Sequence, residues 1–327
     1  MKHPTSPVRH LAPLLAVVAL VLSACGSSTT GAASPTAGGA KLIAFDLGIF
    51  PSAFGGAMLK GATTCGTAAG ATVSLTAPAQ AQPPLQIAQL DAVLAKKPDA
   101  LIIQPDDGTA LIAPMKKFKD AGIPAFTIDT DVNDKTLRLG NITADNVKGG
   151  KVAADTMNTL LSGKGKVLYV GFVPGATTTD QRLQGWKTQL ATYSGLVSVG
   201  EQYNQSSPTE AASKVSASLT KDPDLAGIFA SDENSAVGAA TAVQAAGKAG
   251  KVNIVAFDAA ADEVTALKRG TIQSLIVQKP YDYGCTAVKA MVDYLKNGTK
   301  PPDQTYADYV IANKDNIDSA DVKTYLY

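Results

Sequence analysis

Three carboxylates follow an apolar run in the stretch FTIDTDVND, at Asp129, Asp131 and Asp134. Acids this close together could bind a metal ion, act as a catalytic acid and base, or accept hydrogen bonds from a polar ligand. They could also belong to a solvated turn. The remainder of the sequence has to decide between these alternatives.

The sequence has two histidines, His3 and His10, and both lie in a leader-like start. A chain without histidine beyond that start excludes a Ser-His-Asp or Cys-His mechanism and His-ligated zinc. No GxGxxG or GxxxxGK[ST] pattern follows any apolar run, so the phosphate cradle of a dinucleotide or P-loop protein is missing. We therefore predict no catalytic residue, no metal site and no cofactor, and the protein is expected not to be an enzyme.

The composition is that of a soluble α/β protein, with 17% charged and 6% aromatic residues. The formal net charge of +1 gives no electrostatic case for binding nucleic acid. At 327 residues the chain is long enough for two domains.

The first 25 residues predict an export signal. A basic start precedes the apolar run LAPLLAVVALVL at residues 11–22, which is short for a membrane span. The run ends in Leu22-Ser23-Ala24-Cys25, which resembles the lipobox of bacterial lipoproteins, whose cysteine is acylated. Residues 26–40 then form a tether rich in Gly, Ser and Thr. We expect a protein on the outer face of the cell membrane, held by lipid on Cys25. A plain secretory signal is the alternative.

From Lys41 onward, short apolar runs alternate with segments of helical spacing. The runs predict strands at residues 41–47, 71–76, 100–104, 124–129, 166–171, 196–200, 225–230, 252–258 and 274–278. Helices are expected at about 53–69, 85–96, 108–121, 145–162, 180–193, 208–220, 233–248, 259–268 and 283–296. This alternation indicates parallel sheets covered on both faces, in two doubly wound lobes. An eight-stranded barrel is the competing fold.

Polar residues stand where several of these strands end. In doubly wound sheets, ligands bind beyond the carboxyl ends of the strands. The residues there are Gln104, Asp129, Asp232, Asp258 and Gln278. Acids and amides suit the hydroxyl groups of a neutral ligand. Each residue alone could instead cap a helix, because Asp is favoured at that position.

The sequence resembles the type I periplasmic sugar-binding proteins, which deliver ligands to ABC importers. The resemblance rests on AGIPAFTIDTDV (121–132), ITADNVKGGKVAAD (142–155), PGATTTDQRLQGWK (174–187), LAGIFASDENSAVGAATAVQAAGK (225–248), VNIVAFDAA (252–259) and TIQSLIVQKPYDYG (271–284). It implies two Rossmann-like lobes joined by a three-stranded hinge, with ligand in the cleft. The first lobe would hold residues 41–143 and about 279–304, and the second lobe residues 144–278 and about 305–327.

The resemblance also implies roles for individual residues. Phe54 would lie against a sugar ring, and Asp129 and Asp258 would accept from ring hydroxyls. Gln104 at the second crossover and Gln278 at the hinge would be the amides of the ligand site. Asp232 stands where ribose binders usually have Asn.

At two positions where ribose binders have arginine, this sequence has another residue. Thr130 and Asp131 follow Asp129, and Asp131 would point to the same side as Asp129 if the backbone stays extended. Asp180 replaces the second arginine, and Arg182 lies two residues further on, with either a structural or a ligand-binding role. The aromatic residues Trp186, Tyr281 and Tyr283 are expected mainly in packing.

The implied function is capture of a sugar or polyol for an ABC importer permease, by a monomer that binds no nucleic acid and touches the membrane only through its lipid. A sensory receptor of the same fold is the alternative. A repressor and a glycosidase are disfavoured. The last helix would lie beside the helix that carries Cys65, which makes Cys65 and Cys285 a candidate disulfide.

Overall fold

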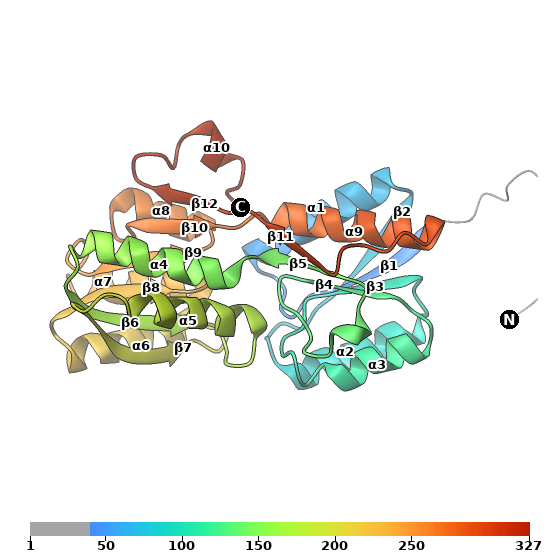
Figure 1. The fold of residues 1–327 in the computed structure, drawn as a ribbon, viewed down its shortest axis with the longest axis horizontal. Coiled ribbons are helices and arrows are strands. Elements are labelled where there is room, and N and C mark those ends of the chain that lie inside the picture. Colours follow the sequence, from blue (N-terminus) through green and yellow to red (C-terminus); the bar gives the residue numbers. More distant parts are fainter. Residues whose placement is uncertain (1–39) are drawn as a thin grey trace, which may run out of the picture. The chain divides into compact units, whose positions relative to one another are not determined.

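A computed structural model describes residues 40–327, which form two α/β lobes (Figure 1). The residues of the expected lipoprotein signal and tether, Cys25 included, lie outside the described part. The first sheet has the strand order β11-β5-β4-β3-β1-β2 and is parallel throughout. Its strands are β1 (Lys41–Asp46), β2 (Ala71–Thr76), β3 (Ala100–Ile103), β4 (Ala125–Ile128), β5 (Asn141–Ala144) and β11 (Gln304–Ala307).

The second sheet has the order β12-β10-β9-β8-β6-β7, and β12 is antiparallel to its neighbour. Its strands are β6 (Gly165–Gly171), β7 (Leu196–Tyr203), β8 (Leu225–Ala230), β9 (Asn253–Phe257), β10 (Ser274–Val277) and β12 (Val310–Asn313). The predicted fold class, two doubly wound lobes, is confirmed.

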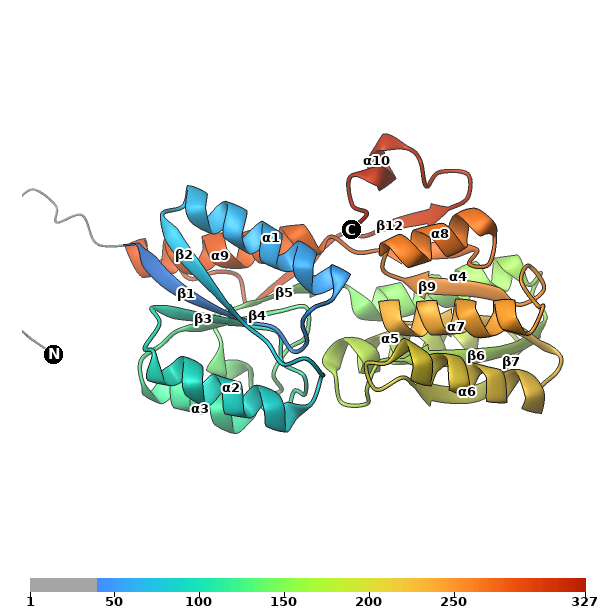
Figure 2. The same ribbon diagram turned by 180° about the vertical axis from the view of Figure 1, so that it is seen from behind.

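Helices cover both faces of each sheet, as Figures 1 and 2 show from opposite sides. On the first sheet, α1 (Ala53–Ala68) and α9 (Pro280–Asn297) cover one face, and α2 (Pro83–Ala95) and α3 (Ile112–Asp120) the other. On the second, α4 (Asn146–Leu160) and α5 (Thr177–Leu190) oppose α6 (Pro208–Lys221), α7 (Glu233–Ala245) and α8 (Ala261–Arg269). The short η1 (Lys135–Leu137) and α10 (Ala320–Lys323) complete the set.

Both faces of the central strands are buried because these strands are mostly apolar. On β1, Ile43 and Phe45 pack under α1 and α9, whereas Ala44 packs with the residues of α2 and α3. Side chains of a strand alternate between faces, so one apolar run supplies both cores.

The chain passes between the two sheets three times. It leaves β5 for α4 after Ala144, leaves β10 for α9 after Val277, and leaves β11 for β12 after Ala307. The sequence placed the last boundary at about residue 304. In the structure, β11 pairs with β5 in the first sheet up to Ala307. The short strands β5, β11 and β12 were not predicted.

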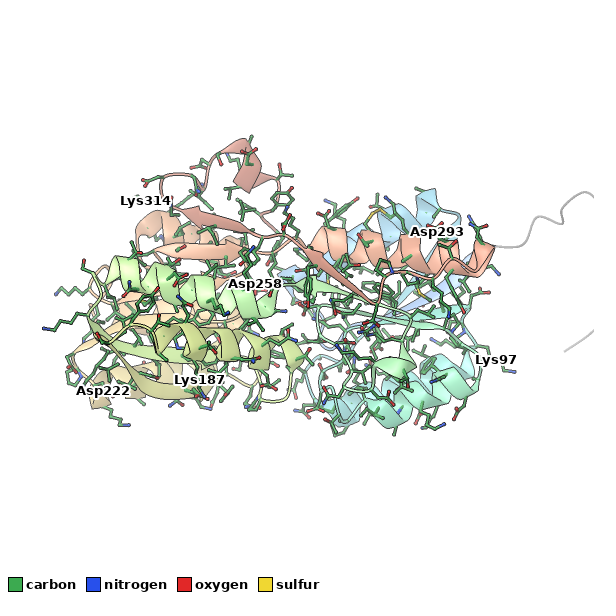
Figure 3. The ribbon with its side chains drawn as sticks, in the orientation of Figure 1. Lys97, Lys187, Asp222, Asp258, Asp293 and Lys314 are labelled. Carbon is green, nitrogen blue, oxygen red and sulfur yellow. A yellow bond between two sulfur atoms is a disulfide. The ribbon has the colours of Figure 1, made fainter. Side chains whose placement is uncertain are left out.

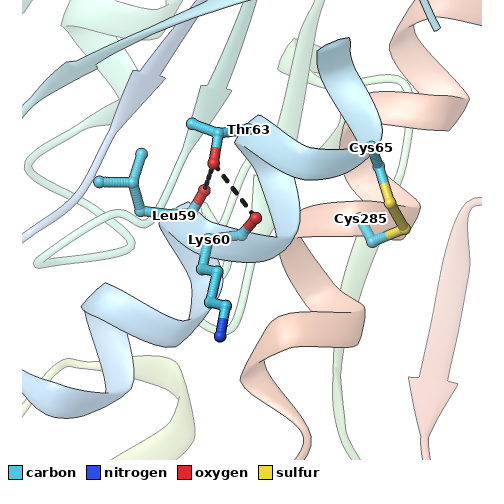
Figure 4. The surroundings of a disulfide bond; sticks show 5 residues. All are labelled: Leu59, Lys60, Thr63, Cys65 and Cys285. Carbon is cyan, nitrogen blue, oxygen red and sulfur yellow. Dashed lines mark hydrogen bonds between the residues drawn. A yellow bond between two sulfur atoms is a disulfide. The ribbon is translucent and has the colours of Figure 1, made fainter. Parts of the chain in front are cut away.

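The helices α1 and α9 cross at very short range. A Cβ on Gly284 would lie 2.0 Å from the carbonyl oxygen of Met58, so a residue with a side chain would push the helices apart. Beside this crossing, Cys65 of α1 and Cys285 of α9 are joined in a disulfide (Figure 4). The bond and the crossing together fix the two helices that carry Phe54 and Tyr283.

Candidate functional site

A cavity with a volume of about 100 Å³ lies among residues of both lobes, at the carboxyl ends of the strands. Seven of the nine ligand-binding residues expected from the sequence line it: Phe54, Gln104, Asp129, Arg182, Asp232, Asp258 and Gln278. Figure 3 labels Asp258, together with Lys187, Asp222 and Lys314 at the outer surface of the same lobe.

Each lobe contributes one amide–carboxylate pair to the cavity wall. Gln104 donates from Nε2 to Oδ2 of Asp129 at 2.7 Å, and Gln278 donates from Nε2 to Oδ1 of Asp258 at 2.7 Å. Because each carboxylate accepts a hydrogen bond from its neighbouring amide, the amide holds the carboxylate in one orientation. The two pairs are therefore preorganised acceptors.

Both acids of these pairs have a left-handed backbone, with φ of 61° at Asp129 and 83° at Asp258. Asp is one of the few residues with a side chain that enters this region at moderate cost. Each acid still continues the hydrogen bonding of its sheet: the N–H of Asp129 donates to the carbonyl of Ile142, and the N–H of Asp258 donates to the carbonyl of Ile276. The strand therefore ends at the acid, and the chain changes direction there.

Burial sets the electrostatics of Asp129. Loss of solvent raises the pKa of its carboxyl to about 6, while the charge of Arg182 and the hydrogen bond from Gln104 oppose the rise. Its Oδ1 is buried and has no hydrogen-bond partner among the described residues. A buried acceptor without a donor is costly, so this oxygen is suited to accept a hydrogen bond from a ligand.

The sequence left open whether Arg182 has a structural or a ligand-binding role, and its contacts fit both roles. Its Nε donates to Asn146 at 2.8 Å, its Nη1 donates to the carbonyl of Ser231 at 2.6 Å, and its guanidinium lies 3.9 Å from the ring centroid of Phe257. The same side chain lines the cavity. It is held rigidly by the second lobe and still presents its charge to the site.

Asp232 caps α7 and also lines the cavity. Its Oδ1 accepts from the N–H of Ser235 at 3.0 Å and from Asn204 at 2.9 Å. Burial raises the pKa of its carboxyl. Asp232 is therefore a helix cap, which was the alternative left open by the sequence, and it also lines the cavity.

Asp131 does not reach the cavity, so its expected orientation is wrong. Its carboxylate accepts from Nε of Arg138 at 2.9 Å and from Nη2 at 2.8 Å, and Thr127 donates to it at 2.7 Å. The expectation assumed that the extended backbone continues past Asp129. The left-handed φ of Asp129 breaks the alternation of side chains and turns Asp131 away.

Asp180 also lies outside the cavity lining. It sits in the first turn of α5, where its Oδ1 accepts from the N–H of Gly175 at 3.3 Å. Residues two apart on a helix point in different directions, so Arg182 faces the site and Asp180 does not.

A family model described as a periplasmic binding protein domain matches residues 43–300. The chain belongs to this family. One similar structure is an ABC transporter solute-binding protein from Agrobacterium vitis with bound α-D-tagatopyranose. It is 37% identical, has a TM-score of 0.86, and the match covers 88% of this chain and 99% of that one.

Curated relatives point the same way. A fructose import binding protein from Bifidobacterium longum is 28% identical, over 90% of this chain and 91% of its own length. A ribose import binding protein from Salmonella typhimurium is 29% identical, over 66% of this chain and 72% of its own length. The resemblance inferred from the motifs is confirmed.

This periplasmic binding protein has further cavity residues that the sequence reasoning missed, among them Ser52, Asp106, Phe172, Thr178, Thr179, Glu233 and Asn234. Asp106 is 6% exposed, and its Oδ2 has no partner in the described part of the chain. Burial and the charge of Asp46 raise the pKa of Asp106 to about 8. The sequence did hold a signal for Asp106 as a site residue, because it lies two residues after Gln104, where a predicted strand ends.

Trp186 and Tyr283 are packed in the interior as expected, whereas Tyr281 is not. Trp186 is buried with its ring centroid 5.0 Å from that of Phe229, and Tyr283 is fully buried, whereas Tyr281 is 37% exposed. Within residues 40–327, no group of three or more His, Cys, Asp or Glu side chains is arranged to hold a metal ion. None of the helices described for those residues has the length and apolarity needed to cross a membrane.

Proposed function

We propose that the protein captures a neutral sugar or polyol outside the cytoplasm and delivers it to an ABC importer. The observation that carries this proposal is the pair of preorganised carboxylates, Asp129 and Asp258, one from each lobe, in one cavity. Capture by both lobes couples ligand binding to closure of the cleft, which is the hinge mechanism of periplasmic binding proteins.

The chemistry of the cavity wall supports a hydroxylated ligand. Five carboxyl groups face one guanidinium there: Asp106, Asp129, Asp232, Glu233 and Asp258 against Arg182. Hydroxyl groups can donate to the oxygens of these carboxyl groups, and hydrogen bonds to the ionised ones are stronger than neutral hydrogen bonds. An anionic ligand such as a sugar phosphate would be repelled. The ring of Phe54 offers an apolar face for the C–H face of a sugar.

Ketohexoses are the first sugars to test. The similar solved structure from Agrobacterium vitis carries a tagatose, and the similar protein from Bifidobacterium longum is a fructose import protein. At the position after Asp129, where ribose binders have arginine, the side chain of Thr130 donates instead to the carbonyl of Pro105 at 2.7 Å. Ribose is therefore expected to bind less tightly than a ketohexose.

The sensory alternative is not favoured, because the curated relatives are import binding proteins. Similarity to sugar import binding proteins supports a protein that is not an enzyme. We extend the proposal to a lipid anchor at Cys25 and a monomeric state. Metabolic labelling with palmitate tests the anchor, with label expected in the wild type and absent from Cys25→Ser.

The function is tested by a thermal-shift screen against D-tagatose, D-fructose, D-ribose, D-allose and xylitol, with fructose 6-phosphate as the anionic control. A ligand at 100 times its dissociation constant stabilises the folded state by about 2.7 kcal/mol. We expect a ketohexose to raise the melting temperature and the phosphate to leave it unchanged. A flat response across the panel contradicts a sugar-binding role. Loss of uptake of the bound sugar in a deletion strain tests the importer.

A further inference from the structure

The segment after α10 returns to the sugar site through Tyr327. The hydroxyl of Tyr327 donates to Oδ1 of Asp258 at 2.9 Å, and its backbone N–H donates to the carbonyl of Ala259 at 3.3 Å. The ring of Tyr327 meets the ring of Phe54 edge to face, with centroids 5.9 Å apart and an interplanar angle of 70°. Tyr327 is not itself part of the cavity lining.

A second tyrosine makes the matching contacts from α9. The ring of Tyr283 meets that of Phe54 with centroids 6.1 Å apart, and its hydroxyl donates to Oε1 of Gln278 at 3.1 Å. Gln278 in turn donates to Asp258 at 2.7 Å. Five residues thus form a closed circuit of contacts, which we call the hinge ring: Phe54, Tyr283, Gln278, Asp258 and Tyr327.

The hinge ring joins elements that are otherwise far apart in the chain. Phe54 and Tyr283 start the two helices of the first lobe that the Cys65–Cys285 disulfide connects. Asp258 ends β9 of the second lobe, and Gln278 lies at a crossing between the lobes. Tyr327 closes the circuit by contacting one residue of each lobe at once.

The donors around Asp258 also restrict what a ligand can do there. An ionised carboxylate offers about four lone-pair positions. Gln278 and Tyr327 occupy two positions at Oδ1, and the N–H of Glu233 occupies one at Oδ2 at 3.0 Å. One direction is left for a hydroxyl of the ligand. The carboxylate can therefore distinguish sugars by where a hydroxyl lies.

We propose that Tyr327 is a positioning residue of the sugar site, one that sets both affinity and selectivity through Asp258 and Phe54. The inference rests on the proposed sugar-binding function. Without the Tyr327 hydroxyl, a second lone pair of Asp258 becomes free and the carboxylate loses one of the donors that fix its orientation. Sugars that differ at one hydroxyl then bind more alike.

The hydroxyl of Tyr327 stays protonated at neutral pH, so it can donate its hydrogen bond to Asp258. Burial, together with the charges of Asp258 and Glu263, raises the pKa of Tyr327 well above its usual value. Tyr327 therefore remains a hydrogen-bond donor. Glu263 is itself fully buried beside the site, and burial likewise raises the pKa of its carboxyl.

The test compares Tyr327→Phe, which keeps the ring and removes the hydroxyl, with Tyr325→Phe as the matched control. Tyr325 lies in the same segment, and within residues 40–327 no hydrogen bond is made by its hydroxyl; its ring lies under the ammonium of Lys279. Dissociation constants for D-tagatose and its epimer D-fructose are measured by calorimetry. Hydrogen exchange of residues 257–262 is measured without ligand.

For Tyr327→Phe we expect about tenfold weaker binding of the better sugar, a smaller ratio between the two epimers, and faster exchange at residues 257–262. The ligand-free melting temperature should stay within about 2 °C, since one hydroxyl is lost and the packing is kept. Tyr325→Phe should match the wild type. A role in packing alone would leave the ratio between epimers unchanged.

Unchanged affinity and exchange in Tyr327→Phe overturn the inference, and so does an equal loss in Tyr325→Phe. A wild type that binds neither epimer counts against the proposed function and not against the positioning role. In that case the exchange comparison decides, because it needs no ligand: faster exchange in Tyr327→Phe supports the inference, and equal exchange overturns it.

Discussion

Gln104 donates from Nε2 to Oδ2 of Asp129 at 2.7 Å, at the carboxyl end of the first sheet. The same relationship joins Gln278 to Asp258 in the second lobe. In both pairs the acid has a left-handed backbone and ends a parallel strand. The two lobes therefore bring equivalent acceptors to one cavity, and each acceptor is fixed by the protein before ligand arrives.

Asp129→Asn should separate binding from stability. Asparagine tolerates the left-handed backbone at this position, and it removes a buried charge whose Oδ1 has no partner in the described chain. At pH 8, where the carboxyl with a pKa of about 6 is ionised, we expect the ligand-free melting temperature to rise by about 2 °C. A fall of several degrees, measured by calorimetry, would show that the carboxylate is needed for the fold.

Ligand-free stability should decline as pH rises from about 5 to 9. Burial raises the pKa of Asp129 to about 6, of Asp46 and Glu233 to about 7, and of Asp106 to about 8. The folded state therefore holds protons in this range that the unfolded state releases, so the free energy of unfolding falls with increasing pH.

Asp106→Asn tests this pH dependence at one residue. The variant should be more stable than the wild type at pH 8, by about 2 °C or more, and its stability should change less between pH 5 and 9. Asp315→Asn, at an exposed position, is the control and should leave the pH profile unchanged. A profile that is equally steep in Asp106→Asn and the wild type would argue against a titration of Asp106.

Asp131→Asn should weaken the fold and leave sugar binding intact. Its partner Arg138 has a side chain with 0% exposure and keeps Asp303 as a second acidic partner, so the loss should be smaller than the roughly 3 kcal/mol expected for a buried charge left without any partner. Denaturant unfolding should report this loss, while the dissociation constant for sugar stays within about twofold. Asp120→Asn removes an exposed pair with Lys116 and should change little. If a stable Asp131→Asn protein bound sugar more weakly, Asp131 would have to be counted among the ligand-binding residues.

The disulfide should be a main source of stability in the first lobe. It joins residues 220 positions apart and connects the helices that carry Phe54 and Tyr283. Closing a long loop restricts the unfolded chain, and loss of such a bond typically costs about 2–4 kcal/mol. We expect the double variant Cys65→Ala/Cys285→Ala and the reduced wild type to melt at a similarly lowered temperature. Equal melting of the oxidised and reduced wild type would show that the bond contributes nothing.

The strand ends that form the site were predictable because the strands are buried on both faces. Gln104, Asp129, Asp258 and Gln278 each interrupt an apolar run, and a parallel sheet brings such positions to one edge. Asp131 was predicted wrongly because the left-handed φ of Asp129 is not visible in an apolar pattern.

Other features depend on long-range contacts that no local pattern carries. The hinge strands β5 and β11 are four residues long and contain Asn141, Thr143, Gln304 and Thr305, so they lack the apolar run of a central strand. Tyr327 reaches Asp258 across 69 positions of sequence. Such contacts arise from the packing of the lobes and could not be deduced from spacing.

The central claim is that Asp129 holds a sugar in the cavity, and calorimetric titration of D-tagatose and D-fructose into the wild type and Asp129→Asn tests it most directly. The account predicts one binding site per chain for at least one of these sugars in the wild type, and binding at least about 100-fold weaker in the variant, because a buried hydroxyl loses its charged acceptor. Absence of binding heat with both sugars, or equal affinity in the two proteins, would contradict it.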